Sequence, residues 1–488
     1  MAADETTPNA PLLDPTGSPI ASPYMEDKYD HVIVGGGMAA VKAVEGIREV
    51  SPEATIAVVS EDVSAPVYRP DLSKKLWTED GDGVQDSVLV TTDEKEPAAP
   101  GVDTHYLLGV EVSDLDPEAH TLVIADKTVS YGSLLLATGS EPVTAGTEVG
   151  ARVHTYRTAS DFRRLHGAVS KSDRVVVVGG GYIGTELAAA LTGVGAQVTL
   201  VSPALPLLSH MLPEELAEAV TKDYEDRGVT LVEGRYASVT EAEYVAEPTE
   251  DDIPQEPEPA KDEEDEDTED TAAAEEAEEQ EEENLSRPSD YGLRAPGVLT
   301  VKLEDGTELN ADRLVLALGV EPRTELAEFA GLKVEDGVVV DKMLQTSAQD
   351  VYAAGDIASY PDALLGTRRV EHADAAETQG LAAGKAMAGQ GEAYTHTPFF
   401  WGDLFEAGYE AIGEITTDHT TVVDMAEDES GKPDPSTAVV YYLDGGTVRG
   451  VLLWSVWDSV PKAEELMKET KDKPVEDPES LKGRIPLG

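Results

Sequence analysis

Two short glycine patterns in this chain have the spacing that lets a backbone wrap around a diphosphate. A complete G-x-G-x-x-G pattern is formed by Gly179, Gly181 and Gly184. It follows the valine-rich run 174–178, which predicts a buried parallel strand, and precedes an Ala/Leu-rich stretch to Leu191, which predicts a helix. A strand, a glycine turn and a helix N-terminus together offer free N–H groups to a pyrophosphate. This stretch therefore predicts a dinucleotide-binding turn.

The same device occurs near the start of the chain. Residues 29–34 predict a strand, and a helix is expected to run to about Val50. Between them stand Gly35, Gly37 and Ala40, a G-x-G-x-x-A variant that the fingerprint permits. The repetition strengthens the interpretation, because a single glycine pattern is a weak signal. We expect two dinucleotide sites in one chain.

Charged side chains lie close to the first pattern. Glu61 follows the predicted strand 54–59, where an acid would hold a ribose hydroxyl; the alternative is one more surface acid. Arg69, Lys74 and Lys75 cluster in a chain that has few bases. They suit a phosphate or an electron-rich ring, or else form the solvated start of a helix.

Two further acids have both a functional and a structural interpretation. Asp356 ends a short apolar strand and opens a helix, so it either bonds a ligand hydroxyl or caps that helix. Glu186 is placed by the pattern in the first turn of its helix, where the helix dipole alone would stabilise a carboxylate. Local spacing does not decide between these interpretations.

The elements that must position these residues alternate between strands and helices, which predicts an α/β fold with two Rossmann-like units. Other predicted strands cover 198–201, 229–239, 298–303, 314–319 and 351–354, with a helix to about Met387. After 198–201 come Ser202, Pro203 and Ala204, which supply neither an acid for a ribose 2′-hydroxyl nor an arginine for a 2′-phosphate. The choice between NADH and NADPH stays open. We favour NADH, because an unpaired phosphate would meet a strongly negative protein.

Composition limits the partners. The 488 residues hold 97 acids and 36 bases, a formal net charge of −61. Such a surface repels phosphate backbones, so nucleic-acid binding is not expected. It suits concentrated salt, where charges are screened beyond about 3 Å at 1 M; ordinary acidic solubility is the alternative. The absence of cysteine excludes thiol chemistry and Cys-ligated metals, and we expect no metal site. With no apolar run of about 20 residues and an acidic first segment, we expect a cytoplasmic protein without a membrane span.

Longer motifs resemble a known family. ATGS at 137–140, ALG at 317–319 and AAGD at 353–356 resemble FAD-dependent pyridine nucleotide oxidoreductases, which bind two dinucleotides. Within that family, the apoptosis-inducing factor-like and ferredoxin reductase-like proteins are similar at SEDVSAPVYRPDLSKKLW (60–77), RRVEH (368–372) and PFFWGD (398–403). The resemblance covers about residues 29–470, apart from an acidic segment.

This resemblance implies roles for the candidate residues. The first glycine unit would hold FAD and the second a nicotinamide nucleotide. The residues implied in FAD binding are Glu61, Arg69, Thr138, Gly139 and Asp356, the last at the ribityl chain.

The resemblance also implies a reaction centre. Lys74 and Glu186 would form an ion pair near the flavin N5 and act in catalysis, while Tyr182 would shield the nicotinamide pocket. His372 and Trp401 would line the flavin face.

On the resemblance we expect five parts. They are a disordered N-terminal tail (1–28), the first part of an FAD-binding domain (29–155), an NAD(P)H-binding domain (156–318) with a disordered acidic insertion (about 247–288), the second part of the FAD-binding domain (319–397), and a C-terminal α+β domain (398–488). The insertion joins two predicted strands that can still pair, because loop lengthening costs only about 0.6 kcal/mol per doubling; an acidic docking segment is the alternative.

The expected function is an FAD-dependent NAD(P)H oxidoreductase that passes electrons to an external acceptor: a quinone, oxygen or a redox protein. One alternative is the NADH–ferredoxin reductase of an oxygenase system. Another is an NADH-sensing redox switch, for which a homodimer is possible, and the simplest is an FAD-binding scaffold without turnover. Apoptotic roles are not carried over, because the basic surface for DNA and a mitochondrial targeting segment are both missing from the sequence.

Overall fold

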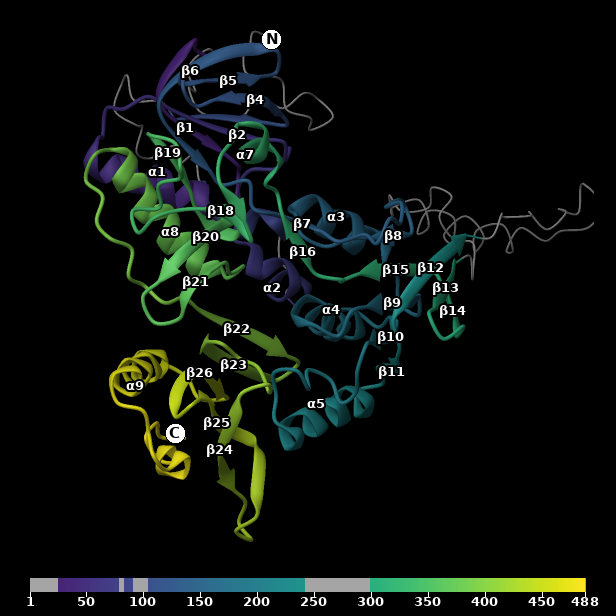
Figure 1. Ribbon diagram of the computed structural model, residues 1–488. Coiled ribbons are helices and arrows are strands. Elements are labelled where there is room, and N and C mark those ends of the chain that lie inside the picture. Colours follow the sequence, from purple (N-terminus) through teal and green to yellow (C-terminus); the bar gives the residue numbers. More distant parts are fainter. Residues whose placement is uncertain (1–24, 79–82, 91–103, 242–298, 488) are drawn as a thin grey trace, which may run out of the picture.

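The computed structural model describes residues 25–78, 83–90, 104–241 and 299–487. The predicted acidic insertion and most of the predicted N-terminal tail lie outside these residues. The described chain forms a mixed sheet and a parallel sheet, each with its helices, and an antiparallel sheet below them that carries the C-terminal helix (Figure 1).

The first sheet has the strand order β3-β2-β1-β6-β5-β4, and β19 pairs with the far end of β6. Strand β1 runs parallel to both β2 and β6, so the glycine turn that follows β1 leaves from the middle of the sheet. Its central strands are almost fully buried, which explains their unbroken aliphatic runs. The strands are β1 (Lys28–Val34), β2 (Ile56–Ser60), β3 (Thr104–Leu108), β4 (Val112–Asp116), β5 (Thr121–Ile124), β6 (Lys127–Leu136) and β19 (Val351–Ala353).

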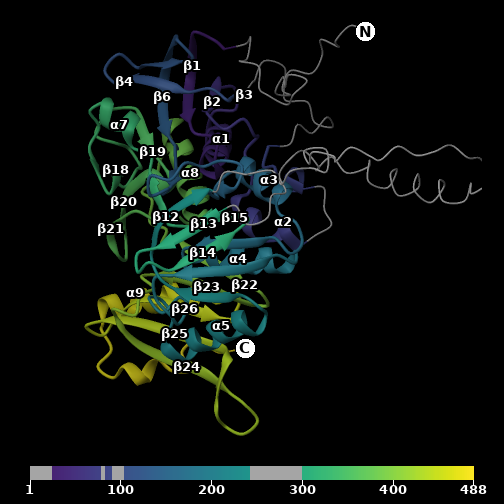
Figure 2. The ribbon, with the colours of Figure 1, turned by 90° about the vertical axis from the view of Figure 1, so that its right-hand side faces the viewer.

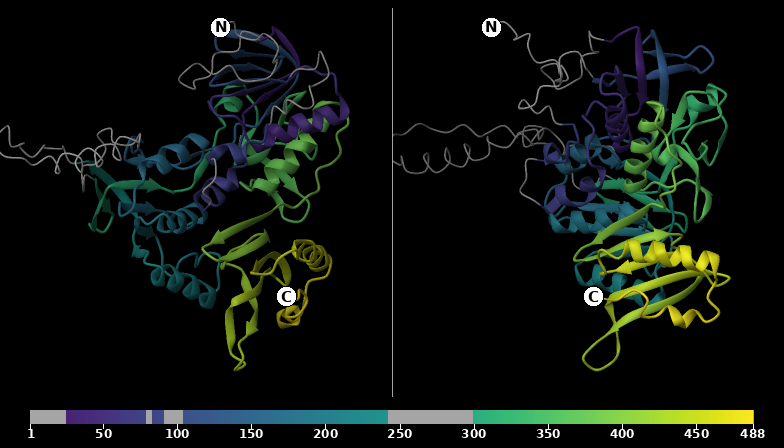
Figure 3. Two further views of the ribbon diagram at one scale, coloured as in Figure 1. Left: turned by 180° about the vertical axis from the view of Figure 1, so that it is seen from behind. Right: turned by 90° about the vertical axis from the view of Figure 1, so that its left-hand side faces the viewer.

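Helices α1 (Met38–Val50) and α8 (Ala373–Met387) pack side by side against this sheet (Figures 1 and 3). Their backbones approach unusually closely, because α8 presents glycines to α1. A Cβ on Gly380 would lie 2.3 Å from the carbonyl oxygen of Ala39, and one on Gly384 would lie 2.1 Å from that of Ala43. The small residues therefore hold the start of α1, and the glycine turn before it, firmly in place.

The second sheet repeats this plan with the parallel order β11-β10-β9-β15-β8. Its strands are β8 (Val153–His154), β9 (Arg174–Val178), β10 (Gln197–Ser202), β11 (Thr230–Glu233) and β15 (Arg313–Leu316). Its helices are α3 (Ala159–Ala168), α4 (Tyr182–Gly193) and α5 (Glu214–Asp226).

One strand prediction in this region is wrong. Residues 229–239 form two strands, β11 and β12 (Tyr236–Glu241), that belong to different sheets. The chain passes from one sheet to the other after Gly234. Gly234 packs closely against Leu303, since a Cβ on Gly234 would lie 2.7 Å from Leu303 Cδ1. The predicted pairing across the acidic segment does occur, with Val239 opposite Val301.

Three smaller sheets accompany the two units in the described part of the chain. Strands β12, β13 (Leu299–Leu303) and β14 (Glu308–Ala311) form one, and β7 (Ser140–Pro142) pairs with β16 (Val320–Pro322) where the chain crosses between units. A third has the order β17-β18-β20-β21, with β17 (Val334–Glu335), β18 (Gly337–Val339), β20 (Ala358–Asp362) and β21 (Gly366–Arg368). Short helices are α2 (Lys75–Thr78) and α7 (Glu325–Phe329).

The C-terminal part is an antiparallel sheet of order β22-β23-β26-β25-β24 followed by a helix. Its elements are β22 (Phe399–Leu404), β23 (Ala407–Gly413), β24 (Thr420–Glu427), β25 (Pro433–Asp444), β26 (Thr447–Trp454) and α9 (Val460–Asp472). This sheet lies next to α4 and α5 of the second unit (Figure 2). Its first strand, β22, also contacts α8, so the sheet lies against both units.

Candidate active site

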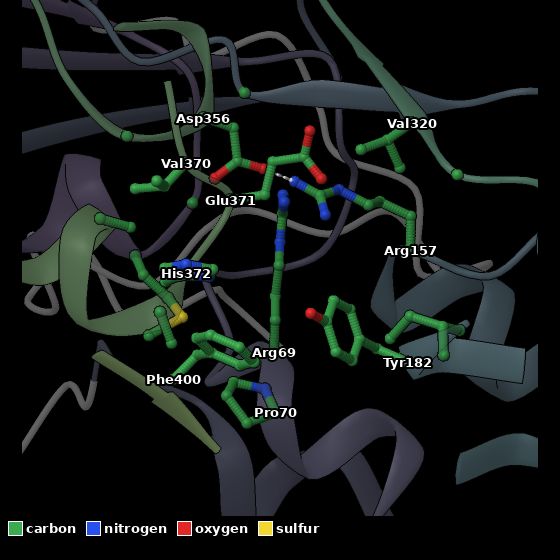
Figure 4. Close-up of a pocket in the computed structure, with 18 of the residues that line it drawn as sticks. Arg69, Pro70, Arg157, Tyr182, Val320, Asp356, Val370, Glu371, His372 and Phe400 are labelled. Carbon is green, nitrogen blue, oxygen red and sulfur yellow. Dashed lines mark hydrogen bonds and ion pairs between the residues drawn. The ribbon is translucent and has the colours of Figure 1, made fainter. Parts of the chain in front are cut away.

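A cavity of about 640 Å³ lies where the two glycine turns, the 69–74 turn and strand β22 meet. Figure 4 shows the side chains of Arg69, Tyr182, His372 and Phe400 gathered around it. The predicted site residues that the cavity brings together are Gly37, Arg69, Lys74, Gly139, Gly181, Tyr182, Glu186, Asp356, His372 and Trp401. They come from positions more than 300 residues apart, yet they share one space.

The remaining glycines build the turns and do not line the cavity. Gly35 has a φ of +125°, and a Cβ there would lie 2.0 Å from the carbonyl oxygen of Ala137. Gly179 repeats this relation, with a φ of +118° and the carbonyl oxygen of Ala317 at 2.0 Å. A Cβ on Gly184 would lie 1.7 Å from the carbonyl oxygen of Gly179. Only glycine fits these positions, so the two turns are a structural repeat as well as a repeat in sequence.

Both turns point a helix N-terminus at the cavity. Gly37 and Gly181 are the N-cap residues of α1 and α4, and neither helix has a side-chain cap or an acid in its first turn. No capping side chain therefore accepts a hydrogen bond from the first N–H groups of either helix, and the positive end of each helix dipole faces the cavity. Ala40, the last residue of the first pattern, is fully buried in α1. Such a pair of termini can bind two anionic groups.

The first turn faces a cluster of charged side chains. Arg157 donates a hydrogen bond to Asp356, and Ser140 Oγ donates to the same carboxylate over 3.2 Å. Burial pushes the pKa of Asp356 upward, but the charges of Arg157 and Arg69 outweigh it and hold that pKa below its usual value. Burial, together with the charge of Arg157, lowers the pKa of Arg69 to about 10. Asp356 is therefore an ionised acceptor beside two cations.

Arg157 is a site residue that the sequence analysis missed. It follows β8 directly and lines the cavity. The available signal was its charge, since arginine is scarce in this chain. Its partner Asp356 is 199 residues away, so no local pattern links them.

Lys74 and Glu186 meet in the cavity wall. Lys74 Nζ lies 2.7 Å from Glu186 Oε1, and Ser73 Oγ donates to Oε2 over 2.6 Å. The Glu186 side chain is only 5% exposed, against 17% for Lys74. Glu186 is the fifth residue of α4 and lies beyond its first turn, so the prediction that placed it there is wrong. Its carboxylate is held by a cation and a hydroxyl from the 69–74 turn.

Aromatic rings also line the cavity. The His372 ring stacks on Phe400 with centroids 4.5 Å apart, and Tyr182 meets Phe400 edge-on at 5.4 Å. Trp401 follows on the same strand and lines the cavity. Burial and the charge of Arg368 lower the pKa of His372 to about 4, so its ring is neutral at neutral pH. These rings offer flat, uncharged surfaces to a planar ring.

Glu61 and Thr138 lie outside the cavity lining. Glu61 forms an ion pair with Arg323, and Thr138 Oγ1 donates to the carbonyl oxygen of Arg323 over 2.8 Å. The N–H of Arg323 donates to the carbonyl oxygen of Gly139 over 3.0 Å. A cofactor contact by Glu61 would have to compete with Arg323. The cofactor roles of Glu61 and Thr138 stay predictions.

The described residues contain neither a membrane-spanning helix nor a cluster of metal ligands. None of the helices in the described ranges is both long and apolar enough to cross a bilayer. Within the same ranges, no three His, Asp or Glu side chains gather as metal ligands do.

Comparison with known proteins gives consistent relatives. Apoptosis-inducing factor 1, mitochondrial, from Dictyostelium discoideum is 29% identical over 493 residues, which cover 94% of this chain and 83% of the relative. The ferredoxin–NAD(+) reductase component of the anthranilate 1,2-dioxygenase system of Burkholderia cepacia is 30% identical over 419 residues, covering 85% and 87%.

The fold also matches solved structures. Putidaredoxin reductase, in its covalent complex with putidaredoxin, superposes with a TM-score of 0.71 at 24% identity, over 94% of this chain and 97% of that one. A ferredoxin reductase from Rhodopseudomonas palustris gives 0.70 at 21% identity, over 92% and 96%. At these identities the likeness concerns the fold.

The family model described as pyridine nucleotide-disulphide oxidoreductase matches residues 29–254 and 275–380, which is well over half of the chain. Disulphide chemistry is excluded here by the lack of cysteine. Family match, relatives and fold together show that this chain belongs to the pyridine nucleotide-disulphide oxidoreductase family, as an NAD(P)H-dependent oxidoreductase with FAD as its cofactor.

Proposed function

We propose that this protein oxidises NADH with FAD held in the cavity and passes the electrons to an acceptor from solution. The observation that carries the proposal is that both glycine-turn helix termini open into one cavity, with the Lys74–Glu186 ion pair in its wall. Two dinucleotides bound at these termini would meet inside the cavity.

The first turn fits the FAD diphosphate. A Cβ on Gly37 would lie 3.6 Å from Arg69 Nη2, and one on Gly139 would lie 3.9 Å from Arg157 Nη2. Arg69 therefore lies at the N-terminus of α1, where an anion is also favoured by the helix dipole, and Arg157 lies beside Arg69 at Gly139. The ionised Asp356 beside them is an acceptor for hydroxyl groups of the ribityl chain. Arg69, Arg157 and Asp356 would hold the FAD, and its isoalloxazine would supply the hydride-accepting and electron-releasing chemistry.

The second turn fits the nicotinamide nucleotide. A Cβ on Gly181 would meet nothing within 4 Å, so the backbone there leaves open space at the N-terminus of α4. Tyr182, the first residue of α4, lines the cavity and contacts Phe400. We assign it to covering the nicotinamide ring.

We assign Lys74 and Glu186 to the space between the flavin and nicotinamide rings. Lys74 would supply a positive charge beside the flavin, and Glu186 would hold the lysine in position. The Ser73 hydroxyl holds the other carboxylate oxygen, so Glu186 has little freedom to turn away. The neutral imidazole of His372 adds no charge of its own to the cavity.

The acceptor must come from outside, because no cysteine pair can store the electrons. A quinone, oxygen or a redox protein meets this requirement. The Burkholderia cepacia relative is named as a ferredoxin–NAD(+) reductase component, which favours an iron–sulfur protein as the second candidate acceptor. Against it, a net charge of −61 repels any acidic electron-transfer protein at low ionic strength.

Rapid mixing of the purified holoprotein with NADH under anaerobic conditions tests the proposal. We expect the flavin absorbance to bleach, and to return when a quinone, oxygen or an oxidised ferredoxin is added. The fastest of the three identifies the acceptor class, and the runs are repeated in low and high salt because of the acidic surface. A flavin that NADH does not reduce within minutes would overturn the proposal.

A further inference from the structure

The second nucleotide-binding unit lacks an acid at the place where this fold usually holds a ribose. Strand β10 ends at Ser202, and Pro203 and Ala204 follow. The Ser202 hydroxyl donates to the carbonyl oxygen of Ala204 over 2.7 Å, so its proton is used within the turn. Some other group must therefore distinguish the two nicotinamide nucleotides.

We infer that Glu233, at the end of the neighbouring strand β11, binds the adenosine ribose 2′-hydroxyl of NADH and rejects the 2′-phosphate of NADPH. This inference rests on the proposed function and names the residue that selects its nucleotide.

The strand register places Glu233 on the correct side of the sheet. Ser202 pairs with Glu233 in the parallel β10–β11 ladder, and paired residues of parallel strands project from the same face. Ser202 faces the glycine turn, since a Cβ on Gly180 would lie 2.3 Å from Ser202 Oγ. Glu233 therefore projects on the glycine-turn side, one strand spacing of about 5 Å further out.

The packing of the preceding residues agrees with this direction. Leu231 packs against the core that contains Leu187 and Leu191 of α4, the helix that the glycine turn opens. Val232 packs against the core on the other face of the sheet. Alternation along the strand returns the next side chain, Glu233, to the α4 face.

The end of β11 is fixed at the level of Ser202. The N–H of Gly234 donates to the carbonyl oxygen of Ser202 over 2.8 Å, which ties the two strand ends together. The Glu233 side chain is exposed, and no residue in the described part of the chain forms an ion pair or hydrogen bond with its carboxylate. It is a free acceptor at a defined position.

The ligand chemistry follows from this placement. A pyrophosphate at the N-terminus of α4 puts the adenosine ribose over the end of the second strand, here β10. An ionised carboxylate accepts hydrogen bonds from ribose hydroxyls but cannot donate to a phosphate. The same group thus attracts NADH and repels NADPH.

Arg235 is the alternative determinant, because an arginine near the end of β11 would favour the 2′-phosphate of NADPH. Its carbonyl oxygen accepts the N–H of Glu304 over 2.9 Å, in the turn that leads away to β12. Its backbone therefore belongs to the adjoining antiparallel sheet. We assign the selection to Glu233, and Arg235 supplies the control.

The test compares the holoprotein with its Glu233→Gln and Arg235→Gln variants. NAD⁺, NADP⁺ and an NAD⁺ analogue without the adenosine 2′-hydroxyl are titrated by calorimetry, and flavin reduction by saturating NADH is timed separately. A charged hydrogen bond of this kind is worth about tenfold in affinity. We expect Glu233→Gln to weaken NAD⁺ binding by that factor, with the limiting rate of flavin reduction unchanged.

The analogue tests the hydroxyl itself. The unsubstituted protein should lose about tenfold in affinity with the analogue, whereas Glu233→Gln, which keeps only a neutral acceptor, should discriminate much less between the analogue and NAD⁺. Arg235→Gln should behave as the unsubstituted protein. The inference is overturned if Glu233→Gln leaves NAD⁺ affinity unchanged, or if the protein prefers NADP⁺ and loses that preference in Arg235→Gln. A flavin that neither NADH nor NADPH reduces would contradict the proposed function instead, since nucleotide affinity is measured independently.

Discussion

Replacing Lys74 by methionine removes the cation that faces Glu186 while keeping most of the side-chain volume. Glu186 Oε1 lies 2.7 Å from Lys74 Nζ, and the carboxylate side chain is only 5% exposed, so water cannot fully replace the ammonium group. Breaking a buried ion pair from one side costs about 3–5 kcal/mol. Because Lys74 is itself 17% exposed, we expect the lower end, a loss of about 3 kcal/mol in the free energy of unfolding.

The effect on the reaction should be separate from the effect on stability. A positioned charge that stabilises developing charge is worth about 100-fold or more in rate. We therefore expect the rate constant of flavin reduction at saturating NADH to fall by about 100-fold, with FAD still bound. Urea unfolding measures the first quantity, and anaerobic stopped-flow absorbance measures the second.

Two control variants separate the effects. The double variant Lys74→Met/Glu186→Gln removes the uncompensated charge, so it should regain much of the stability and remain slow. Lys75→Met alters the neighbouring exposed lysine, which does not line the cavity, and should leave the rate of flavin reduction unchanged. If Lys74→Met lowers stability but reduces its flavin at the unsubstituted rate, Lys74 has a structural role only.

Three further predictions follow from other positions. Gly179→Ala should lose at least about 3 kcal/mol of unfolding free energy in urea, because φ is +118° and the Cβ clashes. Gly181→Ala, with φ at −87° and open space around the Cβ, should keep its stability but bind NADH more weakly. Equal losses of stability in the two variants would contradict these roles. Arg157→Met should release FAD about tenfold more readily, because it removes a charged hydrogen bond from Asp356; unchanged FAD affinity in a flavin-release assay would count against the cluster. His154 is fully buried, and burial lowers its pKa to about 4. The unfolded state, with a pKa of about 6.5, then binds a proton that the folded state does not, so the free energy of unfolding should rise by about 3 kcal/mol from pH 4 to pH 6.5. His154→Leu should flatten that rise, and an unchanged slope would refute it.

The glycine turns could be predicted from the sequence because their constraint is local. A positive φ and a close carbonyl oxygen permit only glycine at positions 35 and 179, so the residue type itself indicates the turn. The buried strands before these turns could also be predicted from local sequence. Parallel strands covered on both faces need continuous apolar runs.

Long-range pairings could not be predicted in the same way. The contact of Arg157 with Asp356 and that of Glu61 with Arg323 join residues that only the fold brings together. The position of Glu186 in α4 was misjudged because the helix begins at Tyr182, after a glycine turn whose length the spacing alone does not fix. The pattern identified these acids as candidates, but their partners depend on packing.

On the proposed function, the cavity walled by Arg69, Arg157 and Asp356 holds one FAD, which NADH reduces. The most direct measurement is the flavin content of the purified protein, taken from the absorbance of FAD released on denaturation and compared with the protein concentration. We predict one FAD per chain, and near-complete loss in the double variant Arg69→Met/Arg157→Met. A folded chain that carries no flavin and takes up none from added FAD would contradict the account.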